Sequence, residues 1–268
     1  MNKKKILFSD IDGTLISYDR IIPQINLEAI EKFKSHNNLF TIASGRSIEA
    51  VRTYAVKTKI NAPAVVSNGS IIYDYQKEEI IWDARLPKNV KEYIQRIFDE
   101  FKDIGIEIHS GHELFVLRHS KETLDHISHE KIKYIEINSL SETNEVWHKV
   151  LFAADHEKLK ELENFCKINP CKGVKLVFTA PVYFEMLHEN ADKGVGLKEL
   201  SNILNIENKD TYAIGDYYND KEMLDSAGYS FLVGGAPDGL KQLADKVVCK
   251  CEDGAVAECI DIILNGVN

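Results

Sequence analysis

Two aspartates follow a short apolar run near the start of the chain. The segment "KILFSDIDGTL" (5–15) places Asp10 and Asp12 directly after apolar residues 6–8, and Gly13 follows at once. If the apolar run is a strand, period-two alternation puts both carboxyl groups on the same side. Two unit charges about 4 Å apart repel by roughly 4 kcal/mol at an effective dielectric near 20. A bound cation, or a proton on one carboxyl, would offset this repulsion.

Further polar residues follow other apolar runs that have the pattern of strands. Parallel strands end at the same edge of a sheet, and ligands of open α/β sheets bind at that edge. The sequence therefore predicts that these residues lie close to the two aspartates. They are Ser44 and Gly45 after "LFTIA", Asp216 after "TYAIG", Asn219 and Asp220 a few residues later, and Lys193, which opens an expected helix.

The residue types in this set suit phosphoryl transfer. Oxygen ligands from Asp10, Asp12 and Asp216, with room for water, suit Mg²⁺ better than zinc. The Ser44 hydroxyl, the neighbouring amides and Lys193 could hold phosphoryl oxygens, whose transfer depends on positioning and charge neutralisation. One aspartate could attack phosphorus, and a second carboxyl could protonate the leaving oxygen. Each motif alone is ordinary turn, cap or surface chemistry, and only their combination favours this site.

The elements that would position these residues alternate between strands and helices at both ends of the chain. Repeats of this length predict parallel pairing, right-handed crossovers and a sheet covered on both faces, which is a doubly wound, Rossmann-like α/β fold. The expected strands are 5–10, 39–44, 64–69, 211–216, 230–235 and 246–251, and the expected helices are 26–34, one from Ser47, 193–204, 219–227, 238–244 and 254–264.

The middle of the chain has a different pattern. A hairpin around Gln76 and Lys77 is followed by a mixture of helices and neighbouring strands, which predicts an α+β domain with antiparallel pairing. The expected organisation is therefore a core domain made of residues 1–83 and 189–268, interrupted by an inserted domain at 84–188. Within it we expect helices at 89–102, 121–130 and 157–167 and strands at 105–111, 114–119, 133–138, 148–154, 174–180 and 182–188.

Composition limits the possible partners. The chain of 268 residues has a formal charge of −9 and a pI near 5.5, which argues against a nucleic-acid or anionic-membrane partner. No apolar run reaches about 18 residues, so no membrane span is expected, and Lys3–Lys5 precede too short an apolar segment for a signal peptide. Five cysteines without paired CxxC units are expected to be free thiols in a reducing cytoplasm, rather than a metal or redox site.

Four segments, taken in order, resemble a known enzyme family. "DIDGTL", "ASGR", "DKG" and "GDYYND" are similar to the four motifs of the haloacid-dehalogenase superfamily of phosphohydrolases. The long insertion between Ser44 and Lys193 resembles the α/β cap of its Cof-type branch, as do "NG" at 68–69 and the tail "LKQLADKV…EDGAVAECI". The resemblance covers essentially the whole core domain.

The resemblance implies roles for the residues that match its motifs. Asp10 would be the nucleophile and Asp12 the general acid/base, with Mg²⁺ held by Asp10, the Asp12 carbonyl and Asp216. Ser44, Gly45 and Lys193 would bind the phosphoryl group, and Asn219 and Asp220 would support the phosphate, the metal or Lys193.

One residue departs from the family pattern, and the resemblance implies no role for the residues of the inserted domain. Family members often have an asparagine where this chain has Gly235, within "VGGAP", which puts a polar contact near the rim of the site in doubt.

The inserted domain is rich in histidines. The pairs His109/His112 and His126/His129 could hold a second metal or contact a substrate, but packed or solvated histidines are the favoured interpretation. Trp82 and Trp147 are expected to be packing residues.

The favoured function is a Mg²⁺-dependent phosphatase that hydrolyses a small phosphorylated metabolite through an aspartyl-phosphate. The inserted domain would exclude bulk water during transfer. Two alternatives stay open: a phosphotransferase, and a phospho-signalling module without turnover. Sugar phosphates, pyridoxal phosphate, flavin mononucleotide and nucleotides are all possible substrates, and the chain could be a monomer or a small homo-oligomer.

Overall fold

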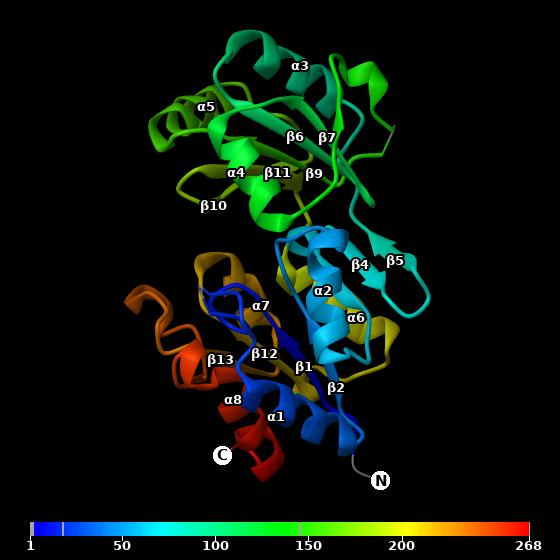
Figure 1. The fold of residues 1–268 in the computed structure, drawn as a ribbon, viewed down its shortest axis with the longest axis vertical. Helices are drawn as coiled ribbons and strands as arrows, with labels where there is room; N and C mark the ends of the chain where they lie inside the picture. Colours follow the sequence, from blue (N-terminus) through cyan, green and yellow to red (C-terminus); the bar gives the residue numbers. More distant parts are fainter. Residues whose placement is uncertain (1–2, 18, 145, 268) are drawn as a thin grey trace. The chain divides into compact units, whose positions relative to one another are not determined.

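The structure, a computed structural model, describes residues 3–17, 19–144 and 146–267. The chain forms two compact units (Figure 1). We call the first the core unit; it consists of residues 1–45, 51–82 and 192–268. The second, the inserted unit, consists of residues 46–50 and 83–191.

The core unit is built on a five-stranded parallel sheet with the order β14-β13-β12-β1-β2. Strand β1, which lies between β12 and β2, is fully buried, as the apolar run Ile6-Leu7-Phe8 requires. This architecture confirms the predicted doubly wound, mainly parallel α/β fold. The strands are β1 (Ile6–Ser9), β2 (Leu39–Ile42), β12 (Thr211–Gly215), β13 (Tyr229–Leu232) and β14 (Lys246–Val247).

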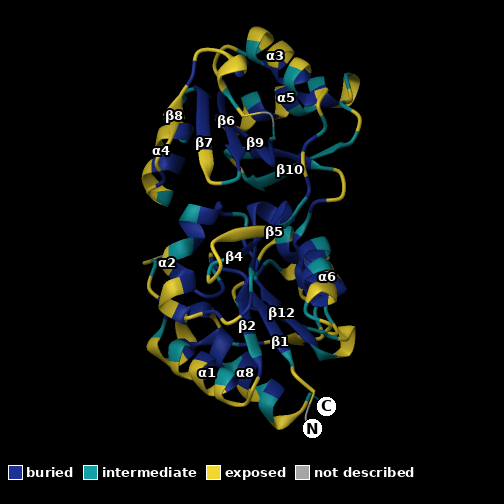
Figure 2. Cartoon of the chain, turned by 90° about the vertical axis from the view of Figure 1, so that its right-hand side faces the viewer, coloured by how far each residue is buried: buried dark blue, intermediate teal, exposed yellow. Residues whose placement is uncertain are grey.

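Helices cover both faces of this sheet. In α1 the buried positions 26, 29, 30 and 33 form one stripe at helical spacing, and this helix packs against α8. On the other face α6 packs against α7, and Figure 2 shows α6 beside the buried strands of the sheet. The helices are α1 (Gln24–Ser35), α2 (Ile48–Thr58), α6 (Lys193–Ile203), α7 (Lys221–Ser226) and α8 (Ala255–Asn265).

A small antiparallel sheet adjoins the parallel one. Strand β3 (Ala64–Val66) meets the chain after β2 through a parallel bridge between Ala43 and Val65. It pairs with β4 (Ile71–Asp74), and β4 pairs with β5 (Glu79–Asp83), which confirms the predicted hairpin.

The inserted unit is a six-stranded sheet with the order β10-β11-β9-β6-β7-β8 and mostly antiparallel pairing. Alternate residues of its strands, such as Ile106 and Ile108, pack with helices α3 and α5 in one apolar core. The elements are β6 (Gly105–Ser110), β7 (Glu113–Arg118), β8 (Ile135–Glu136), β9 (Lys149–Ala153), β10 (Val174–Ala180), β11 (Tyr183–His188), α3 (Val90–Glu100), α4 (Lys121–Glu130) and α5 (His156–Ile168).

Several predicted elements are shorter than expected; the strand expected at 64–69, for example, ends at Val66. The helix expected at 238–244 is wrong: only one 3-10 turn forms, at Asp238–Leu240, because Gly239 disfavours a helix and Leu240 alone is buried in that turn. The strands expected at 246–251 and 133–138 shrink to two residues each, in β14 and β8. Both lie at a sheet edge, where a strand has one neighbour only.

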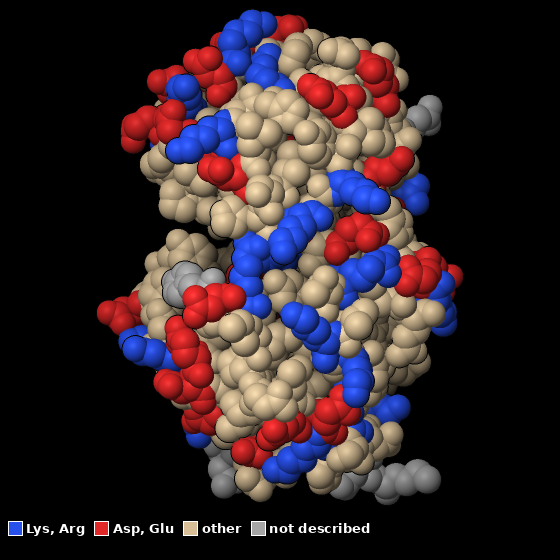
Figure 3. All heavy atoms as spheres, viewed as in Figure 1, with Lys and Arg blue, Asp and Glu red and all other residues tan. Residues whose placement is uncertain are grey.

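The surface and the thiols agree with an ordinary globular chain. Basic and acidic side chains are interspersed on the face of each unit that Figure 3 shows. All five cysteines are free thiols, as predicted. Trp147 is buried in the apolar core of the inserted unit, and Trp82 packs against the core of the other unit. Among the described residues, no helix is both long and apolar enough to cross a bilayer.

Candidate active site

The chain leaves β1 at Asp10 and turns immediately. The Asp10 N–H donates to the Ile214 carbonyl of the neighbouring strand at 3.0 Å, so Asp10 extends the sheet by one residue. Gly13 then has a φ of +79°, which favours glycine, and a Cβ at this position would clash with the Asp216 carboxylate. The glycine therefore lets the turn after β1 approach the end of β12.

A buried lysine joins two of the carboxylates. The Lys193 Nζ lies 2.6 Å from Asp10 Oδ1 and 2.6 Å from Asp220 Oδ1, and the lysine is fully buried. Asp192 caps helix α6 by accepting the Val195 N–H at 2.8 Å, which fixes the helix start beside it. Burial alone would lower the pKa of Lys193, but the charges of Asp10 and Asp220 outweigh it and raise this pKa. The lysine is therefore an ammonium ion.

The carboxylates outnumber this cation. Burial raises the pKa of Asp10 well above its usual value; Lys193 opposes the rise, and the nearby carboxylates Asp220 and Asp216 add to it. Burial, with the charge of Asp220, raises the pKa of Asp216 to about 7, although the Thr14 hydroxyl donates to Asp216 Oδ1 at 2.9 Å. In this site three neighbouring aspartates share one ammonium ion.

The missing charge fits a divalent cation. Oxygen atoms of Asp10, Asp216 and Asp220 lie within 4.8 Å of one another, close enough to share an ion. An all-oxygen donor set suits a hard cation such as Mg²⁺ or Ca²⁺. Both oxygens of Asp220 are already engaged, because Oδ2 accepts the N–H groups of Asp216 and Tyr217 at 3.0 and 3.1 Å. Asp10 and Asp216 are therefore better placed to bind a metal, and Asp220 to position Lys193.

Strand β2 brings Ser44 and Gly45 to the same edge of the parallel sheet as Asp10. The Ala43 N–H donates to the Ser9 carbonyl at 2.9 Å, so the chain after β2 runs beside the chain after β1. Ser44 is buried, and its carbonyl accepts the Asn68 N–H at 3.0 Å. A Cβ on Gly45 would lie 2.9 Å from the Asn68 side chain, which explains the glycine.

Two predicted residues lie outside the buried group. The side chain of Asp12 is exposed at the turn, one residue before Gly13. Asn219 is half-buried within the 3-10 turn Tyr218–Asp220. The structure thus brings Asp10, Lys193, Asp216 and Asp220 together directly, with the other predicted residues on adjoining loops.

Comparison with known proteins identifies the family. The sequence model of the family of haloacid dehalogenase-like hydrolases matches residues 7–260 of this chain. The chain belongs to this family. This confirms the resemblance of its four motifs, and the hydrolase is an enzyme of the phosphatase class.

Its relatives match over nearly their full length. An HMP-PP phosphatase of Yersinia enterocolitica is 26% identical over 92% of this chain and 91% of its own. A 5-amino-6-(5-phospho-D-ribitylamino)uracil phosphatase of Bacillus subtilis is 26% identical over 98% of this chain and 99% of its own. A haloacid dehalogenase-like hydrolase from Bacteroides thetaiotaomicron has the same fold, with a TM-score of 0.89, 23% identity and coverage of 97% and 100%.

Sequence reasoning missed one residue that shapes the hydrolase site. Thr14 is fully buried and holds Asp216, and it follows the predicted pair within the same short motif. Asn68, which follows a predicted strand, adopts a left-handed backbone (φ 52°) and lies against Gly45. The sequence placed Asn68 near the edge of the sheet, but only the fold shows that its side chain lies against the loop after β2.

Several histidines of the inserted unit have carboxylate partners. His126 Nδ1 lies 2.9 Å from Glu107 Oε2, and His126 Nε2 lies 3.6 Å from Glu130. His112 Nδ1 pairs with Glu49 at 2.8 Å. Within the described part of the hydrolase, the only group of metal-ligand side chains close enough to share an ion is the aspartate trio. The second-metal interpretation therefore gains no support.

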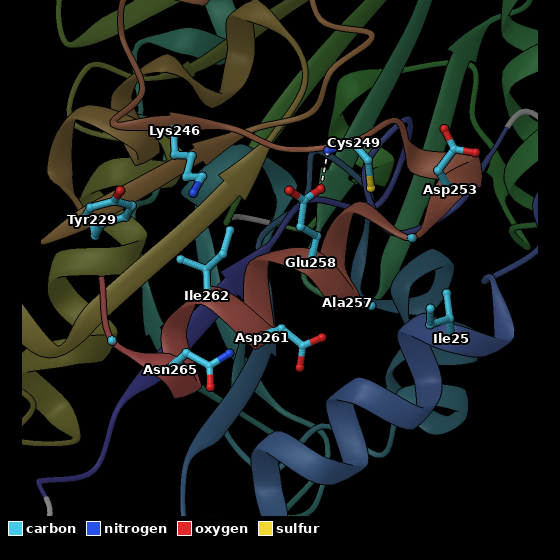
Figure 4. Close-up of a pocket in the computed structure, with 12 residues that line it drawn as sticks. Ile25, Tyr229, Lys246, Cys249, Asp253, Ala257, Glu258, Asp261, Ile262 and Asn265 are labelled. Atoms are coloured by element: carbon cyan, nitrogen blue, oxygen red, sulfur yellow. Dashed lines mark hydrogen bonds between the residues drawn. The ribbon is translucent and has the colours of Figure 1, made fainter. Parts of the chain in front are cut away.

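Two cavities in the described part of the core unit differ in character. The larger has a volume of about 560 Å³ and lies against α8, lined in part by Tyr229, Lys246 and Glu258 (Figure 4). No residue of the aspartate trio lines it. The smaller, about 210 Å³, includes Asp216 in its wall and is therefore part of the active-site region.

Proposed function

We propose that this hydrolase is a Mg²⁺-dependent phosphatase that cleaves a small phosphorylated metabolite through an aspartyl-phosphate on Asp10. The observation that carries the proposal is the buried Lys193 ammonium between Asp10 and Asp220, with Asp216 close by. The relatives are named for HMP-PP and for a phosphorylated ribitylaminouracil, which supports a small organic phosphate as substrate. A sugar phosphatase with the same fold adds sugar phosphates to this range.

Asp10 is the proposed nucleophile. Its Oδ1 is bound to Lys193, so Oδ2 is the oxygen that attacks phosphorus. The new bond joins phosphorus to Asp10, and the bond from phosphorus to the leaving oxygen breaks. Lys193, the Ser44 hydroxyl and the amide of Gly45 would bind the phosphoryl oxygens, with support from Asn219.

Asp12 is the proposed general acid and base. Its carboxyl gives a proton to the leaving oxygen in the first step. In the second step it takes a proton from the water that attacks phosphorus, and the Asp10 carboxylate is restored. The Asp12 side chain is exposed at the turn after β1, two residues from Asp10, where it is accessible to a leaving group and to water.

Mg²⁺ would be held by Asp10, the Asp12 carbonyl and Asp216, with Asp220 nearby. When bound, the ion supplies the positive charge that the carboxylates lack and neutralises charge on the transferred group. We also propose that residues 84–188 act as the cap of residues 1–83 and 189–268 by excluding water. A cytoplasmic location stays a prediction.

Hydrolysis of p-nitrophenyl phosphate, followed by a panel of phosphometabolites, tests the proposal. We expect turnover with Mg²⁺, none with EDTA, and a loss of at least about a thousandfold in Asp10→Asn, because no nucleophile remains. Asp225→Asn, the same change at an exposed helix position, should keep full activity. Mass spectrometry of acid-quenched enzyme should detect one phosphoryl group on Asp10.

Two outcomes would contradict the proposal. Full activity of Asp10→Asn would overturn the nucleophile. Transfer of phosphate to an added alcohol in preference to water would indicate a phosphotransferase, and a phosphoenzyme that persists without turnover would indicate a signalling module.

A further inference from the structure

The smaller cavity of the core unit lies beside the aspartate trio. Its volume is about 210 Å³, and its wall includes Gly13 and Asp216 on the side of the active site. Its wall also includes Gly235, after β13, and Lys250, after β14. A ligand bound near Asp216 could therefore extend into this cavity without leaving the core unit.

Gly235 keeps the cavity open. A Cβ at this position would meet no atom within 4 Å, so a larger side chain would occupy free space instead of clashing. The space beside Gly235 is therefore open to a ligand.

Three hydrogen-bond donors in the cavity wall have no partner among the described residues. They are the Lys250 ammonium, the Ser17 hydroxyl and the Gly235 N–H. An exposed lysine without a partner is common, but a lysine, a hydroxyl and a main-chain amide around one cavity form a donor set for an oxyanion.

The backbone around Lys250 is held in place. The Gly234 N–H donates to the Cys249 carbonyl at 3.1 Å, which ties this segment to the end of β13. The Cys249 N–H donates to Glu258 Oε2 at 2.6 Å, the dashed line in Figure 4, which ties it to α8. Since Lys250 follows Cys249 directly, its backbone is held near Gly235 before any ligand binds, and its exposed side chain extends from this anchored segment.

Two acidic residues and a thiol share the wall. Asp216 accepts a hydrogen bond from the Thr14 hydroxyl. It is also a proposed ligand of the cation, which would offset its negative charge. Glu252 is exposed, so its carboxylate can remain in water. Burial, with the charge of Glu252, raises the pKa of Cys251 to about 12, so this thiol stays neutral. Lys250 is thus the cation of the cavity.

We propose that this cavity is a subsite for a second oxyanion of the substrate, a phosphate or carboxylate carried by the same molecule as the phosphoryl group that reacts. The proposal rests on the proposed function and narrows the substrate class. Bisphosphates and phosphorylated carboxylic acids fit it, and a neutral sugar monophosphate leaves the donors without an acceptor.

Binding of two non-hydrolysable phosphonates tests the subsite without turnover. Calorimetry with Mg²⁺ would compare 3-phosphonopropionate, which has a second anion, with propylphosphonate, which has none. We expect the first to bind about tenfold more tightly, as one hydrogen-bonded charge pair can provide. Lys250→Gln and Gly235→Asn should remove this difference. Lys246→Gln makes the same charge change beside the larger cavity and should preserve the difference.

The outcomes separate the two proposals. Equal affinity of wild type for both phosphonates, or an unchanged difference in Lys250→Gln, overturns the subsite. Equal affinities combined with binding of two inorganic phosphate ions would show that a free ion, not part of the substrate, occupies the cavity, which also overturns it. A protein that discriminates between the phosphonates but hydrolyses no phosphate ester retains the oxyanion site and overturns the phosphatase.

Discussion

The Lys193 Nζ lies 2.6 Å from Asp10 Oδ1 although the two residues are 183 positions apart in the chain. Both side chains are almost completely buried, and a second carboxylate, Asp220, shares the lysine. The ammonium ion favours the ionised form of Asp10 and so opposes the rise that burial causes in the pKa of Asp10. One contact therefore serves both the stability of the core unit and the reactivity of the proposed nucleophile.

Replacing Lys193 should damage both properties. Lys193→Met leaves Asp10 and Asp220 buried without a counter-charge, which costs about 3–5 kcal/mol of unfolding free energy. We also expect phosphatase turnover to fall by at least about a hundredfold, because the phosphoryl group loses its fixed positive charge. Urea unfolding and p-nitrophenyl phosphate hydrolysis measure the two effects. Lys198→Met, at an exposed position of the same helix, should change neither; equal behaviour of the two variants would contradict the assigned role.

Mg²⁺ should stabilise the folded protein. Since the aspartate trio lacks positive charge, the ion binds the native state, and at one hundred times its dissociation constant it adds about 2.7 kcal/mol. The melting temperature should therefore rise with Mg²⁺ and return to its starting value with EDTA. Asp216→Asn should abolish most of the rise, whereas Asp225→Asn should keep it. A rise of the same size in both variants would place the ion elsewhere.

Thr14 should affect Mg²⁺ binding because its hydroxyl donates a hydrogen bond to Asp216. Thr14→Val keeps the shape of the side chain but removes the 2.9 Å hydrogen bond to Asp216 Oδ1. The loss of one hydrogen bond to a charged group corresponds to about 1.5–3 kcal/mol. We expect the loss mainly as weaker Mg²⁺ binding, measured as a higher Mg²⁺ concentration for half-maximal activity. Thr53→Val, at an exposed position, is the control; an unchanged Mg²⁺ requirement in Thr14→Val would show that the bond does not position Asp216.

Local patterns predicted which residues lie at strand ends, and the rule for open α/β sheets predicted that those ends meet. Asp10, Lys193 and Asp216 could therefore be chosen from the sequence, although their catalytic roles remain predictions. The contact of Thr14 with Asp216 could not, because it depends on the φ of Gly13 and on the distance between two loops. The weak helix expected at 238–244 failed because a helical period says little about which side chains the tertiary fold buries.

The inserted unit illustrates the same limit. His126 and Glu130 are four residues apart on α4, so their pairing follows from helical geometry. Glu107 lies on strand β6, and only the packing of α4 on the sheet brings it to His126. The sequence offered these histidines as metal ligands or packed residues, and the carboxylate that decides between these interpretations is distant in the chain.

The stability of the inserted unit should fall at alkaline pH because of His126. Burial would lower the pKa of His126, but its hydrogen bonds to Glu107 and Glu130 outweigh burial and raise the pKa to about 10 from an ordinary value of 6.5. A raised pKa means that the folded state holds the proton more tightly than the unfolded state does. The stabilisation is therefore complete below pH 6.5 and is lost as the pH rises to about 10. A pKa difference of one between the two states corresponds to about 1.4 kcal/mol.

Trp147 allows this effect to be measured in the inserted unit alone. In a Trp82→Phe background Trp147 is the only tryptophan, so its fluorescence during urea unfolding reports on the core of that unit. We expect the unfolding free energy to decrease by a few kcal/mol between pH 6.5 and 10. His126→Gln should be less stable at pH 6.5 and should lose most of this decrease. His129→Gln, exposed on the same helix, should retain it, and the same pH profile in both variants would show that His126 carries no proton in the folded unit.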